Sequence, residues 1–170
     1  MAKLEKVLVA LFAIGLMLRF SRLDGGDVIT VLAGMLLGAL YLFFGFALLA
    51  GVRARHIFTG SAYQKLTALQ LLLAAIAGSA LGIAAVATVF CALWWQGGSA
   101  LHFIALAGLI PLLFIVLVLR RTMVPPDRLT GWVIRIVAAL VLVLAAPYFP
   151  QPSHHLPASS APPAGQQAGG

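Results

Sequence analysis

The feature of this sequence that most constrains its fold is the absence of charged residues from three long segments. No Asp, Glu, Lys or Arg occurs in residues 28–52, 66–95 or 99–119. A helix of a soluble protein needs one polar face in contact with water, and these segments have none. Each of them reaches the ~20 mostly apolar residues that a membrane-spanning helix needs. The sequence therefore predicts an integral membrane protein.

The composition of the whole chain agrees with a protein surrounded by lipid. Hydrophobic residues make up 62% of the 170 residues and charged residues 9%, whereas soluble domains carry about 25% charged residues. The formal net charge of +7 is interpreted as basic residues between apolar spans, so nucleic acid is not an expected partner. The single cysteine, Cys91, excludes an intramolecular disulfide and is expected to be a small buried thiol.

We predict an all-α, polytopic transmembrane helical bundle of five spans in residues 1–149, followed by a disordered tail at 150–170. The first span is short, because only residues 7–18 are free of charge, and the basic residues at its ends must snorkel to the headgroups. The tail is rich in Pro, Ala, Ser and Gly and cannot bury enough apolar surface to fold. The predicted spans are residues 4–20, 28–52, 66–95, 99–119 and 132–149.

Local signals mark several helix ends. Asp27 is expected to be the N-cap of the second helix. Ser61 and Gln64 fit a capping box of the form S-x-x-Q, so the third helix is expected to begin near Ala62. Arg135 lies one turn inside the fifth span and is expected to snorkel back towards the interface.

Basic residues are distributed unequally between the two sides that five spans define. Nine Lys and Arg residues fall on the side of the N-terminus and two on the other side. Because Lys and Arg favour the cytoplasmic side of short loops, we predict a bacterial inner-membrane protein with a cytoplasmic N-terminus and an external C-terminus. The nine are Lys3, Lys6, Arg53, Arg55, Lys65, Arg120, Arg121, Arg128 and Arg135, and the two are Arg19 and Arg22.

Two of the predicted helices carry a G-x-x-x-G pattern. The second helix has Gly34 and Gly38, and the third has Gly78 and Gly82. Apolar area does not hold helices together in lipid, so close approach of backbones at small residues takes its place. We expect the two pairs to pack on each other within one chain, and the alternative is that one of them forms a homodimer.

Residues typical of catalysis or metal binding are not evident in the sequence. Transporters usually place ionisable groups inside their spans, and no acid is expected to be buried deeply enough to carry protons. His56 and His102 fall on opposite sides, so they cannot ligate one haem together. His154 and His155 are adjacent in the predicted tail and make a poor metal site. We therefore expect no enzymatic activity, no cofactor and no metal.

The most compact polar cluster of the sequence lies at the expected outer interface. It contains Arg19 and Arg22 at the end of the first helix, and Asp24 and Asp27 before the second. Arg near a helix C-terminus and Asp at the next N-terminus both complement the helix dipoles. The cluster is interpreted either as a rigid corner whose charges neutralise each other or as a binding site, and the sequence favours the corner.

The same segment resembles a known family. Residues 1–50 are similar to the N-terminal membrane hairpin of the gliding motility protein L family and related small membrane proteins of gliding bacteria. In that family a K-L-x-H-x-P-G-(G/A)-N pattern follows the first helix. Arg19-Phe20 matches the K-L, Gly25-Gly26 the G-(G/A), and Asp27 the Asn. Asp24 stands in place of the Pro and Arg22 in place of the His.

What the resemblance implies is a hairpin of similar shape without the motor activity. Residues 40–46, LYLFFGF, resemble the aromatic stretch that follows in the family. The family's second helix carries a membrane-embedded Glu implicated in force generation. The second predicted span of this chain holds no acid, so the resemblance does not carry proton-driven force generation over to it.

The expected function is that of a non-enzymatic integral membrane protein that acts through protein or lipid contacts. Its expected partners are the lipid bilayer and either further copies of itself or a membrane-complex partner. One alternative is a small transporter or channel for a neutral or apolar solute, working as a homo-oligomer. Another is an accessory subunit of a larger complex. Solute flux in liposomes and co-purification in mild detergent would distinguish these functions.

Overall fold

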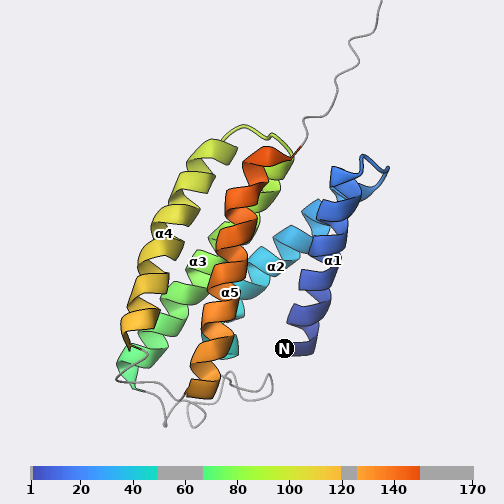
Figure 1. Ribbon diagram of the computed structural model, residues 1–170. Coiled ribbons are helices and arrows are strands. Elements are labelled where there is room, and N and C mark those ends of the chain that lie inside the picture. Colours follow the sequence, from blue (N-terminus) through green and yellow to red (C-terminus); the bar gives the residue numbers. More distant parts are fainter. Residues whose placement is uncertain (1, 50–66, 120–125, 150–170) are drawn as a thin grey trace, which may run out of the picture.

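The computed structural model describes residues 2–49, 67–119 and 126–149, and these segments are helical with no strand among them. The predicted all-α bundle is therefore confirmed for this part of the chain. Figure 1 shows the helices lying side by side along one common direction. They are α1 (Ala2–Phe20), α2 (Gly26–Leu49), α3 (Ala68–Ala92), α4 (Gly98–Leu119) and α5 (Pro126–Ala145), followed by a short 3₁₀ helix, η3 (Ala146–Tyr148).

Helix α3 lies at the centre of the bundle and packs against α2, α4 and α5. Helix α1 packs mainly against α2, on the outside of the bundle. The start of α1 and the start of α5 lie at the same end of the molecule, and the α1–α2 and α3–α4 turns lie at the other (Figure 1). The helical bundle thus has two distinct ends, and each of them is formed by several helix termini.

Within the described segments, four helices are long and apolar enough to cross a membrane. The apolar stretches are Gly26–Ala47, Ala68–Ala92, Gly98–Val118 and Thr130–Tyr148. Helix α1 is not among them, since its 19 residues include Lys3, Glu5, Lys6 and Arg19.

Side-chain sizes are distributed in the way that a lipid environment favours. The buried face of α3 consists largely of alanine and glycine, so its neighbours can approach closely. Large apolar side chains point outward instead, as at Phe43 (71% exposed), Phe103 (70%) and Phe114 (68%). In water such an outer surface would be an aggregation liability, whereas in a bilayer it is the surface that contacts lipid tails.

The interface between α2 and α3 is built on glycine. A Cβ added at Gly78 would lie 2.8 Å from the Cα of Gly45 and 2.9 Å from the carbonyl oxygen of Tyr41. A Cβ added at Gly82 would lie 3.0 Å from the carbonyl oxygen of Gly38. These distances leave no room for a side chain against a backbone, so α2 and α3 approach each other closely within one chain, where Gly38 meets Gly82 and Gly45 meets Gly78.

Gly34 has a different environment from the other three glycines of the two patterns. A Cβ there would collide with the side chains of Val89 and Phe12 rather than with another glycine. Gly34 therefore makes room for side chains of α3 and α1. The register pairs Gly38 with Gly82 and Gly45 with Gly78, so the two G-x-x-x-G motifs are offset along the interface.

The predicted starts of two helices are wrong. Helix α2 begins at Gly26, after Gly25 adopts a left-handed φ of 85°, so Asp27 lies in the first turn and is not the N-cap. Helix α3 begins after Thr67, whose hydroxyl accepts from the backbone of Gln70 in a complete capping box. That cap replaces the start expected near Ala62.

Other predicted boundaries also differ from the observed ones, by a few residues. Helix α3 ends at the C-cap Leu93, before the predicted Trp95, because Trp94 turns into the left-handed region at a φ of 57°. Helix α5 begins at Pro126, earlier than the predicted residue 132, and gives way to η3 at Ala146. Ser61, Gln64 and the predicted tail at 150–170 lie outside the described residues.

Candidate functional site

The four residues of the predicted corner lie at the α1–α2 turn, and two of them form an ion pair. Arg19, only 7% exposed, pairs with Asp27 through Nη1 and Oδ1. Its Nε also donates to the carbonyl oxygen of Ala92 at 2.6 Å. Because Ala92 is the last residue of α3, where carbonyls lack helical partners, Arg19 connects the ends of α1, α2 and α3.

The other two corner residues do not join this pair. Arg22 has a left-handed φ of 56° and an exposed side chain, and Asp24 is exposed too. Neither takes part in an ion pair with any residue that the structure describes. The four charges thus do not converge on a common point, and the arrangement at Arg19 and Asp27 is that of a structural corner.

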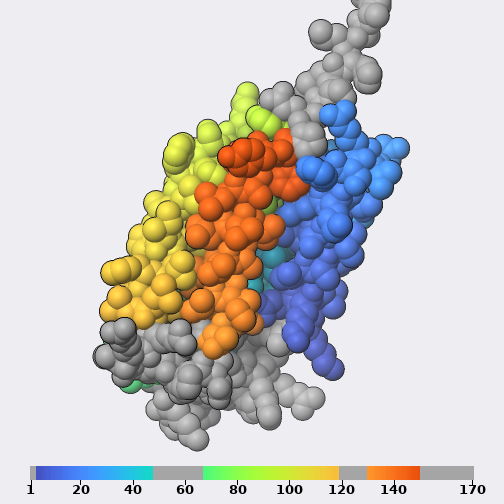
Figure 2. Space-filling model, in the orientation of Figure 1, coloured from blue at the N-terminus to red at the C-terminus, as the bar shows by residue number. Residues whose placement is uncertain are grey.

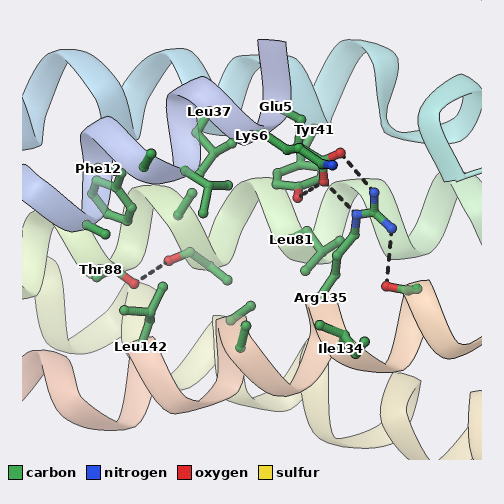
Figure 3. Close-up of a pocket in the computed structure, with 18 residues that line it drawn as sticks. Glu5, Lys6, Phe12, Leu37, Tyr41, Leu81, Thr88, Ile134, Arg135 and Leu142 are labelled. Carbon is green, nitrogen blue, oxygen red and sulfur yellow. Dashed lines mark hydrogen bonds and ion pairs between the residues drawn. The ribbon is translucent and has the colours of Figure 1, made fainter. Parts of the chain in front are cut away.

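A second polar network, not predicted from the sequence, lies at the opposite end of the bundle. Glu5 of α1 is 5% exposed. Its Oε1 accepts from the hydroxyl of Tyr41 at 2.6 Å and from Nε of Arg135 at 2.5 Å. Its Oε2 accepts from Nη2 of Arg135 at 2.8 Å. We call Glu5, Tyr41 and Arg135 the Glu5 network, and it joins α1, α2 and α5 (Figure 3).

The sequence analysis did not anticipate the partners of these two residues. Arg135 forms a bidentate pair with Glu5, and its Nη1 reaches back one turn to the carbonyl oxygen of Gly131 at 3.2 Å. Glu5 is buried, but it lies near the end of α1 and is fully paired. Pairing and hydrogen bonding are what make a buried charge tolerable, so the network is first of all a structural element.

A sequence signal for this pair did exist. Glu5 is one of only four acids in the chain, and Arg135 stands alone inside the apolar sequence of α5. In the predicted topology both residues lie near the same membrane surface. Two opposite charges at matching depth in different spans are candidates to pair, and this rule would have found the network.

Beside the Glu5 network lies an apolar groove of about 540 Å³. Its floor is buried and comes mainly from α2 and α3, with Leu37, Leu81 and Ala84 among the residues that form it. Its rim consists of exposed residues of α1 and α5, among them Ala10 and Ala138. We call this feature the α1–α5 groove, and its volume lies within the roughly 300–1,000 Å³ typical of ligand sites.

The groove opens to the side of the bundle. Figure 2 shows the surface hollowed between α1, in blue, and α5, in orange, with α2 visible at the bottom of the hollow. Along α5 the lining runs from Gly131 to Leu142, about 16 Å at ~1.5 Å per residue. In Figure 3, Glu5, Lys6, Tyr41 and Arg135 gather at one end of the groove and the other labelled residues, all apolar except Thr88, line the rest.

Other polar residues singled out in the sequence have local roles or lie elsewhere. The Cys91 thiol, half-buried, donates to the carbonyl oxygen of Gly98 at 3.2 Å. His102 packs edge-on against Phe103, and its buried Nδ1 has no hydrogen-bond partner among the described residues. No group of three or more metal-ligating side chains occurs within those residues. His56, His154 and His155 lie outside them.

The described residues thus form a helical bundle with four helices suited to a membrane and an apolar groove that is polar at one end. Comparison of the chain with known protein families, with curated proteins and with solved structures finds no match. The resemblance of residues 1–50 to the gliding motility protein L family stays a prediction. The functional argument that follows therefore rests on the geometry of the groove.

Proposed function

We propose that this chain is a non-enzymatic integral membrane protein that holds a lipid or another apolar molecule in the α1–α5 groove. The observation that carries the proposal is the groove itself, with an apolar lining of about 540 Å³, a buried floor and a lateral opening. A lateral opening between two helices faces lipid rather than water in a spanning bundle. A lipid tail can enter such a groove without leaving the bilayer.

The proposal includes five spans, with α1 crossing the membrane beside α2. Two of the four charges of α1 are compensated inside the protein, because Glu5 pairs with Arg135 and Arg19 with Asp27. The remaining two, Lys3 and Lys6, lie at one end, where they can snorkel to the headgroups. The 19 residues of α1 measure about 28 Å at ~1.5 Å per residue, close to the ~30 Å hydrocarbon core.

Five spans place the N-terminus and the end of α5 on opposite sides, and the basic residues favour a cytoplasmic N-terminus in a bacterial inner membrane. A reporter fused after Gly170 tests this orientation. Activity of a reporter that works only outside the cytoplasm supports it, and activity of a cytoplasmic reporter contradicts it. Further copies of the chain or a membrane-complex partner would then meet its exposed apolar faces.

The dimensions of the groove favour lipid holding over transport of a solute. The lining covers about 16 Å along α5 at ~1.5 Å per residue, which is half of a ~30 Å core. A transport path needs the full thickness, whereas a lipid tail occupies one leaflet. Flux of a neutral solute into liposomes that depends on this protein would instead favour a small transporter or channel.

Photo-crosslinking with a lipid tests the proposal directly. The full chain is reconstituted into vesicles with a trace of phospholipid that carries a diazirine in its tail, and crosslinked peptides are mapped by mass spectrometry. We expect labelling at the groove residues Ala10 and Ala138 to exceed labelling at Phe114 and Val118 of α4, which are exposed but do not line this groove. Equal labelling of both surfaces would indicate ordinary lipid contact and contradict the proposal.

A further inference from the structure

The charges at the polar end of the groove determine which lipid headgroup fits there. Three charged side chains line the groove: Glu5, Arg135 and Lys6. Glu5 and Arg135 neutralise each other in a bidentate pair. Lys6 also attracts Glu5 electrostatically, but among the described residues it forms no direct ion pair. The three charges therefore leave the groove with a net charge of about +1, carried by Lys6.

Glu5 neutralises the charge of Arg135, and partners inside the protein use three of the five N–H donors of its guanidinium group. Its Nε and Nη2 donate to Glu5, and its Nη1 donates to the carbonyl oxygen of Gly131. Both carboxylate oxygens of Glu5 are likewise occupied. Lys6 differs, because its side chain is exposed at the rim of the groove and an ammonium group offers three donors.

The depth of Lys6 in the bundle also matches a headgroup. It lies near the N-terminal end of α1, and the apolar lining continues from it through Val9 and Ala13. A lipid whose tail lies on this lining has its headgroup at the level of Lys6. An ammonium group at that level attracts a lipid phosphate that carries a net negative charge more strongly than one balanced by choline.

We propose that the α1–α5 groove selects an anionic glycerophospholipid, with one acyl tail along the groove and the headgroup phosphate on Lys6. This inference rests on the proposed function, since it specifies the headgroup of the lipid that the groove holds. The occupant belongs to the leaflet on the N-terminal side of the protein. The expected preference is about fivefold over a zwitterionic lipid, the factor that ~1 kcal/mol per surface lysine corresponds to.

The experiment compares two photoactivatable probes with identical diazirine tails, phosphatidylglycerol and phosphatidylcholine. Each is added at the same low fraction to vesicles of phosphatidylcholine and phosphatidylethanolamine that contain the full chain. The ratio of phosphatidylglycerol to phosphatidylcholine labelling is measured at Ala10 and Ala138. It is divided by the same ratio at Phe114 and Val118 of α4, which corrects for general attraction of anionic lipid to basic residues.

Three variants decide the role of Lys6. In Lys6→Gln the corrected ratio is expected to fall from about five to near one, and in Lys6→Arg it is expected to stay high. Lys3→Gln is the matched control, since Lys3 lies one turn away on α1, is exposed and does not line the groove. Size-exclusion profiles equal to that of the parent protein establish that each variant is folded.

The possible outcomes separate this inference from the proposed function. Groove labelling by both probes alike in the parent protein overturns headgroup selection and leaves lipid holding intact. A ratio that Lys6→Gln does not lower, or that Lys3→Gln lowers equally, overturns the role of Lys6. The absence of groove labelling by either probe overturns the proposed function as well.

Discussion

The α2–α3 interface and the α1–α5 groove differ in how closely two helices of the bundle approach each other. At the interface, glycine lets backbones meet, with the site of a Gly78 Cβ only 2.8 Å from the Cα of Gly45. At the groove, α1 and α5 stay apart and leave about 540 Å³ between them. Helix contacts in a membrane depend on close packing rather than on apolar area, so the interface contributes stability and the groove contributes space.

Contacts at both ends of α1 connect it to residues 135 and 149, and the groove lies between them. At one end Glu5 pairs with Arg135. At the other, Phe20 of α1 meets Phe149 in an edge-on ring contact with centroids 6.3 Å apart. Between these ends, alanines on both rims leave the space unfilled. The comparison teaches that small residues can have two outcomes: glycines let α2 and α3 meet, whereas alanines leave space between α1 and α5.

The largest effect is expected at the Glu5 network. Glu5→Leu leaves Arg135 without its partner, which should cost about 3 kcal/mol, the low end for breaking a buried pair, because the Arg135 side chain is 29% exposed. Adding Arg135→Met should restore most of the loss, apart from the unpaired Tyr41 hydroxyl. Unfolding free energies from denaturant titration in micelles measure both. Equal losses in the single and double variants would show that the pair itself is not the source of stability.

A smaller effect is expected where the α2–α3 interface is overfilled. Gly78→Ala places a methyl group against the backbone of Gly45 and Tyr41 and should cost about 1–3 kcal/mol. Gly108→Ala is the control, since its methyl would meet only the Cβ of Ala80 at 3.7 Å. The control should be neutral or more stable by up to about 1 kcal/mol. Thermal unfolding in detergent compares them, and equal melting temperatures would contradict the tight interface.

The α1–α2 corner should show a further, more modest loss. Arg19→Gln removes the ion pair with Asp27 and the bond to Ala92, at a cost of about 1.5 kcal/mol, typical of a charged hydrogen bond. Arg22→Gln, at an exposed position without such contacts among the described residues, should change the unfolding free energy little. The same titration measures both, and a larger loss for Arg22→Gln would reverse the roles assigned to them.

The smallest effect is expected from adding volume to the groove. Ala138→Leu extends an exposed rim side chain into existing space, so stability should change by less than about 0.5 kcal/mol, as at ordinary surface positions. Ala77→Leu, at a fully buried position of α3, should instead cost about 1–3 kcal/mol. If unfolding titrations gave both variants the same loss, the groove would be as closely packed as the interface. Ala138→Leu should also reduce lipid crosslinking at Ala10.

The sequence predicted the all-α class because the absence of charged residues is visible along the whole length of each apolar segment. It also identified Gly38, Gly78 and Gly82 as sites of close approach, since a four-residue spacing places small residues on one helix face. Thr67 and Gln70 show why helix ends are harder: two S/T-x-x-Q matches were available, and local sequence did not rank them.

The Glu5 network and the groove lay beyond local reasoning for a different reason. Glu5 and Arg135 are separated by 130 residues, and their pairing depends on how three helices are placed around α3. The groove is a volume that side chains leave empty between Ala10 and Ala138. An empty volume depends on the packing of several helices, so no single residue of the sequence indicates it. Matching opposite charges by their predicted depth in the membrane would have identified the Glu5–Arg135 pair. It would not have identified the groove beside that pair.

The separation of Glu5 and Arg135 along the chain also bears on the order of assembly. During synthesis α1 emerges before the other described helices, and its buried acid has no cationic partner until α5 follows. At roughly 5–20 residues per second, the 130 residues between them correspond to a delay of roughly 6–26 s. Over that interval α1 can contact α2 at both ends, through Arg19 and Asp27 and through the hydroxyl of Tyr41 on Glu5. The charge of Glu5, however, stays without Arg135 until the last of these helices has been made.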